Sequence, residues 1–399
     1  MDGKTTEPLK SFRRTLFLPL LLLCFFLIWS ISYFVSTLLI NVSASFNVPI
    51  GTASQFLTIA TITGLIVGLA MSALAIRYKH RSLFIFGVAL YPILALIWSF
   101  APNFATAALA SVLAGVGGAM ITIMAYTLIG EHLPLEKRGW AMGLFLASIM
   151  ASALVVAPLS GFIAGISGWR MVPLEFIFPM SIVCLVLAVL VVPSNQPQPN
   201  SEAQPSFVQA VKRIFTQISP IACLVSTAMI AFVVFPYFAV SFLRIAFSLS
   251  PTYAGLCMSM AAAVGIVGGV AGGRLVNRIG RKPLAITSAL FFGLSALIFT
   301  FMPTVAFSVL AWALNAFAGG LYFTGLPSLN LEQVPEYRGS MMSIANSFDN
   351  AGTILGLSVA GLVLNLYASF HLVYVIFGVV GLATVPVLFF FAKDPCKRV

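Results

Sequence analysis

The sequence contains very little charge. Of its 399 residues, 8% are charged, only ten are acidic, and 60% are hydrophobic. A soluble protein of this length could not cover its surface with so few charged side chains, so the composition excludes that class. The five cysteines form no CxxC motif or other metal-ligand spacing, and no nucleophile and base are paired in the sequence. We therefore expect no disulfide framework, no metal or other cofactor, and no enzymatic activity.

The hydrophobic residues fall in runs of about 20, which is enough for a helix to cross a hydrocarbon core of roughly 30 Å. The sequence predicts an all-α membrane protein with twelve transmembrane helices. The predicted spans are 16–40, 54–76, 83–100, 104–130, 140–163, 173–192, 218–242, 253–276, 284–301, 305–331, 341–364 and 371–392. The first run is too long for the apolar region of a cleaved signal peptide, so we count it as a helix.

The formal net charge of +11 is distributed unevenly. When the twelve spans are laid out in order, 19 of the 21 Lys and Arg residues fall on the side of the termini, and only Arg170 and Arg244 fall on the other. This bias predicts that both termini are cytoplasmic, with the protein in the plasma (inner) membrane. A nucleic-acid partner is not expected, because the basic residues do not cluster on one soluble face.

The chain repeats itself after about 200 residues. Residues 64–81 recur as 265–282 at an offset of 201, and Arg138-Gly139 recurs as Arg338-Gly339 at an offset of 200. Duplicated helical halves are the plan of many secondary transporters. We therefore predict a six-helix bundle over 1–192, a cytoplasmic linker over 193–217, and a second six-helix bundle over 218–399.

Two further patterns accompany the repeat. Small residues at four-residue spacing predict close helix contacts, which are either static packing or seams between moving halves. They lie at Gly64/Gly68/Ser72, Gly161/Gly165, Gly265/Gly269/Gly273 and Gly352/Gly356/Ala360. The linker segment 207–215 is expected to form an amphipathic helix, with Lys212 and Arg213 toward the phosphates of membrane lipid.

Asp349 is the one acidic residue deep inside a predicted span, because the other nine lie in loops, tails or span ends. It follows Gly339 by ten residues, which places it roughly 15 Å into the membrane core. A charge at that depth costs on the order of 3 kcal/mol, and no Lys, Arg or His in a span can pair with it. Two interpretations stay open. Asp349 binds a proton, a cationic substrate or both in turn, or it is a protonated side chain held by Asn346 or Asn350 between packed helices.

Residues 273–282 read G-R-L-V-N-R-I-G-R-K and resemble a loop signature of the major facilitator superfamily, G-x-L-A-D-R-x-G-R-K. The resemblance covers the whole chain. It implies two pseudo-symmetric six-helix bundles that rock about a central site by alternating access, in a monomer. The family's acid, which helps to lock the halves together, is replaced by Ile76 and Asn277 in the two copies. The gating loops implied by the resemblance comprise Arg77, Arg81, Gly273, Asn277, Arg278, Gly280 and Arg281.

The family plan implies that helices 1, 4, 7 and 10 border the central cavity. Each carries one tyrosine that could line it, namely Tyr33, Tyr126, Tyr237 and Tyr322, and helix 10 adds Asn315. A tyrosine offers an apolar ring with a hydroxyl at its end, which suits a binding cavity. The alternative for each is an aromatic packed between helices, or, for Tyr237, one in the membrane-interface belt.

The motifs on helix 5 narrow the resemblance. Residues 157–161 and 168–170 resemble a weakened Gly-Pro signature of the proton-coupled drug antiporters. No Lys or Arg lies in the middle of a span, which disfavours anionic substrates, and few buried amides are present for a sugar.

We therefore predict a secondary transporter that exports small hydrophobic or amphiphilic solutes, with proton coupling through Asp349 as one option. The first alternative is an uncoupled or differently coupled carrier of a neutral metabolite or sugar. The second is a membrane sensor or scaffold that does not transport.

Overall fold

A computed structural model describes residues 7–132, 135–193 and 207–395 of the chain. All regular secondary structure within these ranges is helical, and the twelve predicted transmembrane helices are confirmed. The spans are formed by α1 (Glu7–Ser45), α2 (Ile50–Ala53) with α3 (Gln55–Arg77), α4 (His80–Phe100), α5 (Phe104–His132), α6 (Leu135–Ser167), η1 (Pro173–Ile177) with α7 (Phe178–Val191), α9 (Ile218–Phe232) with α10 (Phe235–Ala246), α11 (Pro251–Ile279), α12 (Arg281–Phe299), α13 (Val305–Gln333), η2 (Pro335–Tyr337) with α14 (Arg338–Tyr367), and α15 (Phe370–Phe391).

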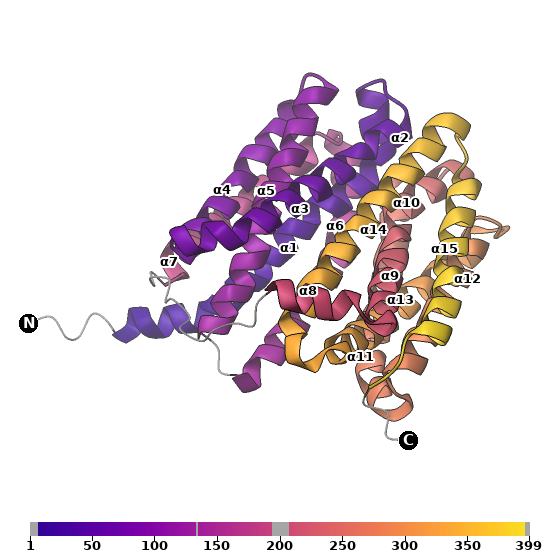
Figure 1. Ribbon diagram of the computed structural model, residues 1–399. Helices are drawn as coiled ribbons and strands as arrows, with labels where there is room; N and C mark the ends of the chain where they lie inside the picture. The colour runs from indigo at the N-terminus through magenta and orange to yellow at the C-terminus, as the bar shows by residue number, and fades with distance from the viewer. Residues whose placement is uncertain (1–6, 133–134, 194–206, 396–399) are drawn as a thin grey trace, which may run out of the picture.

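One short helix, α8 (Phe207–Phe215), precedes the second set of spans. Residues 194–206 of the predicted linker lie outside the described part, as do residues 1–6 and 396–399 at the ends of the two predicted bundles. The first described helix begins and the last one ends on the same side of the bundle, which we call the terminal side (Figure 1).

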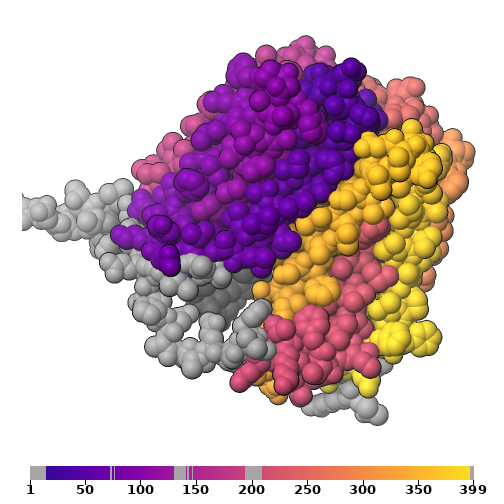
Figure 2. Space-filling view, turned by 45° about the horizontal axis from the view of Figure 1, so that its top comes forward, coloured from indigo at the N-terminus to yellow at the C-terminus, as the bar shows by residue number. Residues whose placement is uncertain are grey.

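The two sets of six spans form two pseudo-symmetric bundles. The pair α3 and α5 packs together in the first bundle as α11 and α13 do in the second, and α4 packs on α7 as α12 packs on α15. The space-filling view shows the two bundles as lobes that lie side by side, one indigo to violet and the other orange to yellow (Figure 2). The sequence repeat is therefore a repeat of whole helical bundles.

Most of the small-residue seams pack inside one bundle. A Cβ at Gly64 would contact Gly115 on α5, and one at Gly265 would contact Ala316 on α13. Gly352 and Gly356 press α14 against the backbone of α9 so closely that no larger residue fits without a shift. At these four glycines the seam is static packing inside one bundle, because small residues let helix backbones approach closely. A Cβ at Gly269 or Gly273 would meet no heavy atom within 4 Å.

The hydrogen bonds between described residues of different bundles lie in the part of the spans farther from the terminal side. Ser259 on α11 donates to the carbonyl oxygen of Leu154 on α6 at 2.6 Å. Asn365 at the end of α14 donates to the Thr52 hydroxyl on α2 at 3.2 Å. Gly161 and Gly255 let α6 and α11 touch along their backbones. The two bundles are thus closed against each other on the side opposite the termini.

Candidate functional site

The seventh span is interrupted where it packs on α14, the helix that carries Asp349. Its two helices, α9 and α10, are joined by Val233 and Val234, whose backbones have φ/ψ of −78°/72° and −76°/48°. These are inverse γ-turn conformations. Val234 N–H donates to Phe232 O, and Phe235 N–H donates to Val233 O, both at 2.8 Å.

Pro236 explains the interruption. In an unbroken helix the N–H of residue 236 would donate to the carbonyl oxygen of Phe232, and proline has no N–H to donate. The carbonyls in the first turn of α10, just after the break, accept further hydrogen bonds from neighbouring helices. Tyr374 on α15 donates its hydroxyl to Phe235 O at 3.0 Å. Ser36 on α1 lies 3.1 Å from Pro236 O and 3.0 Å from Tyr237 O, in a bifurcated hydrogen bond.

This arrangement brings Tyr237 into a cluster with three other predicted site residues. Tyr33 on α1 lies within electrostatic range of Tyr237 on α10. Asp349 on α14 lies within electrostatic range of both Tyr237 and Tyr322. We call Tyr33, Tyr237, Tyr322 and Asp349 the central cluster. It brings together one helix of the first bundle and three of the second, and the packing of Tyr237 against the main core favours a position within the bundle over one in an interface belt.

The hydroxyl of Tyr322 is held in a fixed position. It donates to the carbonyl oxygen of Ser226 on α9 at 3.2 Å. The neighbouring Thr227 accepts a hydrogen bond from the amide of Asn330 at 3.1 Å. The side chain of Tyr322 is therefore oriented toward the cluster by α9, the helix that leads into the break.

Asp349 has no hydrogen bond and no ion pair among the residues that the structure describes. It lies deep among protein atoms but keeps some accessible surface. Asn350, one of its predicted neighbours, donates instead to the carbonyl oxygen of Asn346 at 2.9 Å, and Asn346 is exposed. A carboxyl group at this depth without a counter-ion is available to take up a proton or a cation.

Two predicted site residues lie apart from the central cluster. The amide of Asn315 donates to Phe292 O at 3.0 Å and to Ser295 Oγ at 3.1 Å, so its side chain is directed into the contact between α13 and α12. Tyr126 packs within the first bundle, with ring centroids 5.7 Å from Phe25 and 5.6 Å from Phe145. Tyr126 is 42% exposed, so these rings cover only part of it.

The predicted gating loops make the same contact in both bundles. Arg81 at the start of α4 donates to Val189 O near the end of α7 at 2.6 Å. Lys282 at the start of α12 donates to Phe389 O near the end of α15 at 2.8 Å. The two donors are 201 residues apart and the two acceptors 200, so the contact itself is duplicated. Each one ties together helices of a single bundle.

One predicted loop residue, Arg281, pairs with a carboxylate that the sequence analysis missed. Glu332 at the end of α13 pairs with Arg338 at 2.8 Å and with Arg281 at 3.9 Å. Gly280 adopts a φ of +91°, which favours glycine at the turn between α11 and α12. The role of Glu332 depends on these contacts between distant segments, which the sequence does not show. The one signal in the sequence is the repeat, because Glu131 stands 201 residues before Glu332.

The other predicted loop residues show no such contact. Arg77, Asn277 and Arg278 are exposed, and a Cβ at Gly273 would meet no heavy atom within 4 Å. The loops on the terminal side are therefore anchored by Arg81, Lys282 and the ion pairs of Glu332.

Comparison with known proteins decides the family. The model of the Major Facilitator Superfamily matches residues 20–235 and again 220–399. The chain belongs to this superfamily. It is an integral membrane protein and a transporter for small molecules rather than an enzyme.

Relatives of several kinds share parts of the sequence. The MFS-type transporter YceJ of Bacillus subtilis (strain 168) is 24% identical over 289 residues, which is 71% of this chain and 73% of the relative. The arabinose-proton symporter of the same organism is 34% identical over 125 residues, 30% of this chain and 25% of that protein. A multidrug resistance protein B homolog of Mycobacterium tuberculosis is 26% identical over 150 residues, 36% and 28% of the two chains.

Solved structures share the whole fold. The D-xylose-proton symporter superposes with a TM-score of 0.81 at 17% identity, covering 98% of this chain and 100% of the symporter. The bacterial homolog of the human lysosomal transporter Spinster, in its inward-facing unoccupied conformation, gives 0.76 at 17% identity, with 97% and 96% covered. These similarities establish the architecture of two bundles and leave the substrate to be argued from the site.

Proposed function

We propose that this transporter exports small hydrophobic or amphiphilic solutes, neutral or cationic, in exchange for protons. The observation that carries the proposal is the unpaired carboxyl group of Asp349 between the tyrosines of the central cluster. A carboxyl group that no described cation neutralises can hold a proton in one conformation and release it in another. Aromatic rings around it offer apolar surface and favourable contacts for a cationic head group.

The buried amides support this substrate class over sugars. A sugar is recognised by several free amides and acids that bind its hydroxyl groups. In this chain the amides of Asn315, Asn330 and Gln333 are used to bind helices to one another. Asn346 and Asn350 remain near Asp349, which is a small polar set for a polyhydroxylated solute.

The positive charges and the inter-bundle contacts suggest the state that the structure represents. Following the charge bias, we place the terminal side in the cytoplasm of a bacterial-type plasma (inner) membrane. The hydrogen bonds between bundles lie on the opposite side, so the central cluster would open toward the cytoplasm. Proton-driven export begins from such a state, in which the solute binds from inside. The match to the multidrug resistance protein B homolog and the drug-antiporter signature on α6 agree with this direction.

The test is transport in liposomes with an imposed pH gradient. Purified protein is reconstituted, and internal pH and solute content are followed while lipophilic cations, neutral drugs and sugars are added. Wild type is compared with Asp349→Asn and with Glu175→Gln, which removes an exposed carboxylate at η1. We expect proton movement that depends on the solute in wild type and Glu175→Gln, and its loss in Asp349→Asn.

Other outcomes would redirect the proposal. Solute flux without proton movement, equal in all three proteins, would make this a uniporter and leave Asp349 a packing residue. Flux of sugars alone would favour the second candidate function, a sugar carrier. Two similarities support that candidate: the shared fold of the D-xylose-proton symporter and the partial match to the arabinose-proton symporter. No flux of any solute would favour the sensor or scaffold.

A further inference from the structure

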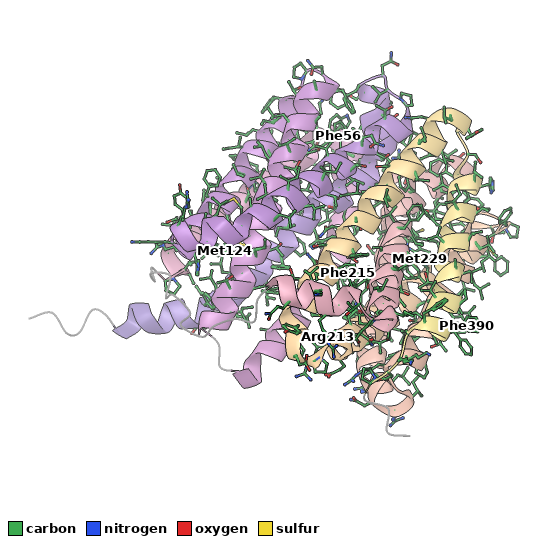
Figure 3. All side chains as sticks on the ribbon, viewed as in Figure 1. Phe56, Met124, Arg213, Phe215, Met229 and Phe390 are labelled. Carbon is green, nitrogen blue, oxygen red and sulfur yellow. The ribbon has the colours of Figure 1, made fainter. Side chains whose placement is uncertain are left out.

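The helix α8 is docked on the second bundle by one face. Ala210 and Ile214 on that face are fully buried. Ile214 belongs to a small hydrophobic cluster, separate from the main core, with Leu224 on α9 and Met341 and Ile344 on α14. In Figures 1 and 3 the helix crosses α9 and α14 near the terminal side. Through this cluster α8 is fixed to the helix that carries Asp349.

The other face of α8 is basic and exposed. Lys212 and Arg213 lie in its last turn, and neither side chain pairs with a carboxylate among the residues that the structure describes. Directly after them, the ring of Phe215 is 45% exposed and Ile218 is 69% exposed. Two cations beside two exposed apolar side chains match a membrane surface, where phosphate groups lie above acyl chains.

The contacts of α8 reach the central cluster in one further step. The rings of Phe215 and Phe348 have centroids 6.4 Å apart, and Phe348 directly precedes Asp349 on α14. Leu224 lies two residues before Ser226, whose carbonyl oxygen accepts the hydrogen bond of Tyr322. A force that presses α8 onto the bundle therefore acts on both helices that shape the cluster.

We propose that α8 is a binding site for an anionic phospholipid and that the bound lipid stabilises the docked position of α8 on α14. Lys212 and Arg213 bind the phosphate groups, and Phe215 and Ile218 contact the upper part of the acyl chains. The lipid thus becomes a ligand that stabilises the first turns of the Asp349 helix. The proposal goes beyond the choice of solute and does not depend on proton coupling.

The first test measures lipid binding directly. Protein in detergent is titrated with phosphatidylglycerol or phosphatidylcholine, and bound lipid is counted by native mass spectrometry. Wild type is compared with the double variant Lys212→Gln/Arg213→Gln and with the charge-conserving control Lys212→Arg/Arg213→Lys. We expect phosphatidylglycerol binding at this site to weaken by on the order of 30-fold in the Gln variant and to persist in the control, since each basic residue near an anionic surface contributes about fivefold. Phosphatidylcholine should show no such difference.

The second measurement reads the effect on the helices without needing transport. Hydrogen exchange of residues 207–217 and 335–345 is compared in nanodiscs of phosphatidylcholine with and without phosphatidylglycerol. We expect slower exchange with phosphatidylglycerol in wild type and the control, and no slowing in the Gln variant.

Equal phosphatidylglycerol binding in all three proteins would overturn the proposal. Displacement of the lipid by millimolar inorganic phosphate would also overturn it and would make α8 a site for a free anion. A protein that binds the lipid as expected but moves no solute would support this site and count against the proposed transport function, so that the two failures are separable.

Discussion

The guanidinium group of Arg244 on α10 donates to the side-chain oxygen of Asn41 on α1 at 2.7 Å and approaches Thr37 O at 3.4 Å. The contact joins the two bundles on the side opposite the termini, and the guanidinium is partly buried. A hydrogen bond from a charged donor contributes about 1.5–3 kcal/mol. It therefore stabilises the closed state of that side.

Removing this bond should favour opening. In Arg244→Gln we expect the population closed on that side to fall roughly 10-fold or more relative to the open one, following the energy of a charged hydrogen bond. Pulsed electron paramagnetic resonance between spin labels at Ser45 and Tyr367, in a background with the native cysteines replaced, measures the distance across this side. Arg170→Gln is the matched control, because that guanidinium bonds to Ala101 O within the first bundle. Identical distance distributions for both variants would show that the contact between Arg244 and Asn41 does not stabilise the closed state.

The close approach of α14 and α9 predicts a stability effect. Gly356→Ala places a Cβ against the carbonyl oxygen of Phe232, where the two backbones touch. Overpacking of this kind costs typically 1–3 kcal/mol. Thermal unfolding in detergent should show a lower midpoint for Gly356→Ala, and an unchanged midpoint for Gly165→Ala, whose added Cβ meets no atom within 4 Å. Equal midpoints in the two variants would contradict the contact.

The central cluster separates two tyrosines that look alike in sequence. Tyr237→Phe removes a hydroxyl of the central cluster, within electrostatic range of Asp349, whereas Tyr126→Phe removes one among the aromatics of the first bundle. Loss of one hydrogen bond of about 1 kcal/mol corresponds to roughly 5-fold in rate or affinity. We expect initial transport rates to fall by that order for Tyr237→Phe and to stay near wild type for Tyr126→Phe. The opposite ranking would move the site into the first bundle.

The absence of a described counter-ion at Asp349 predicts how binding depends on pH. The carboxyl group attracts a lipophilic cation only when it has lost its proton, so that raising the pH strengthens binding of the cation and lowering it releases the cation. Fluorescence titration of the purified protein with such a cation should show tighter binding as pH rises. Asp349→Asn carries no titrating group at this position and should give a flat profile; a profile parallel to wild type would assign the pH dependence to another group.

The twelve spans could be predicted because each is an unbroken apolar run, and the halves because the loop sequences repeat. Asp349 could be found because it is the one acid at membrane depth. The break in the seventh span after Phe232 could not be predicted from the sequence. Pro236 is its cause, yet Pro92 and Pro158 lie inside continuous helices, so a proline in a span does not by itself locate a break.

The rest of the site depends on contacts between distant segments. Asn315 and Tyr322 are seven residues apart on one helix and both polar in the middle of a span, but one side chain is directed to α12 and the other to α9. Glu332 reads as an ordinary helix end until Arg281 and Arg338 are brought to it by the fold. Only the packing of the helices distinguishes these roles.

The interruption at Val233 and Val234 also divides the seventh span into two helices that are attached to different bundles. Below it, α9 is pressed onto α14 by Gly352 and Gly356, whereas α10 above it is hydrogen-bonded to α1 through Ser36 and Arg244. A helix encoded in the second repeat is thus joined, at its outer part, to the first. Separation of the two bundles must either sever α10 from α1 or bend the chain at two residues that have already left the helix. The mechanical boundary of the protein therefore need not coincide with the boundary of its duplication.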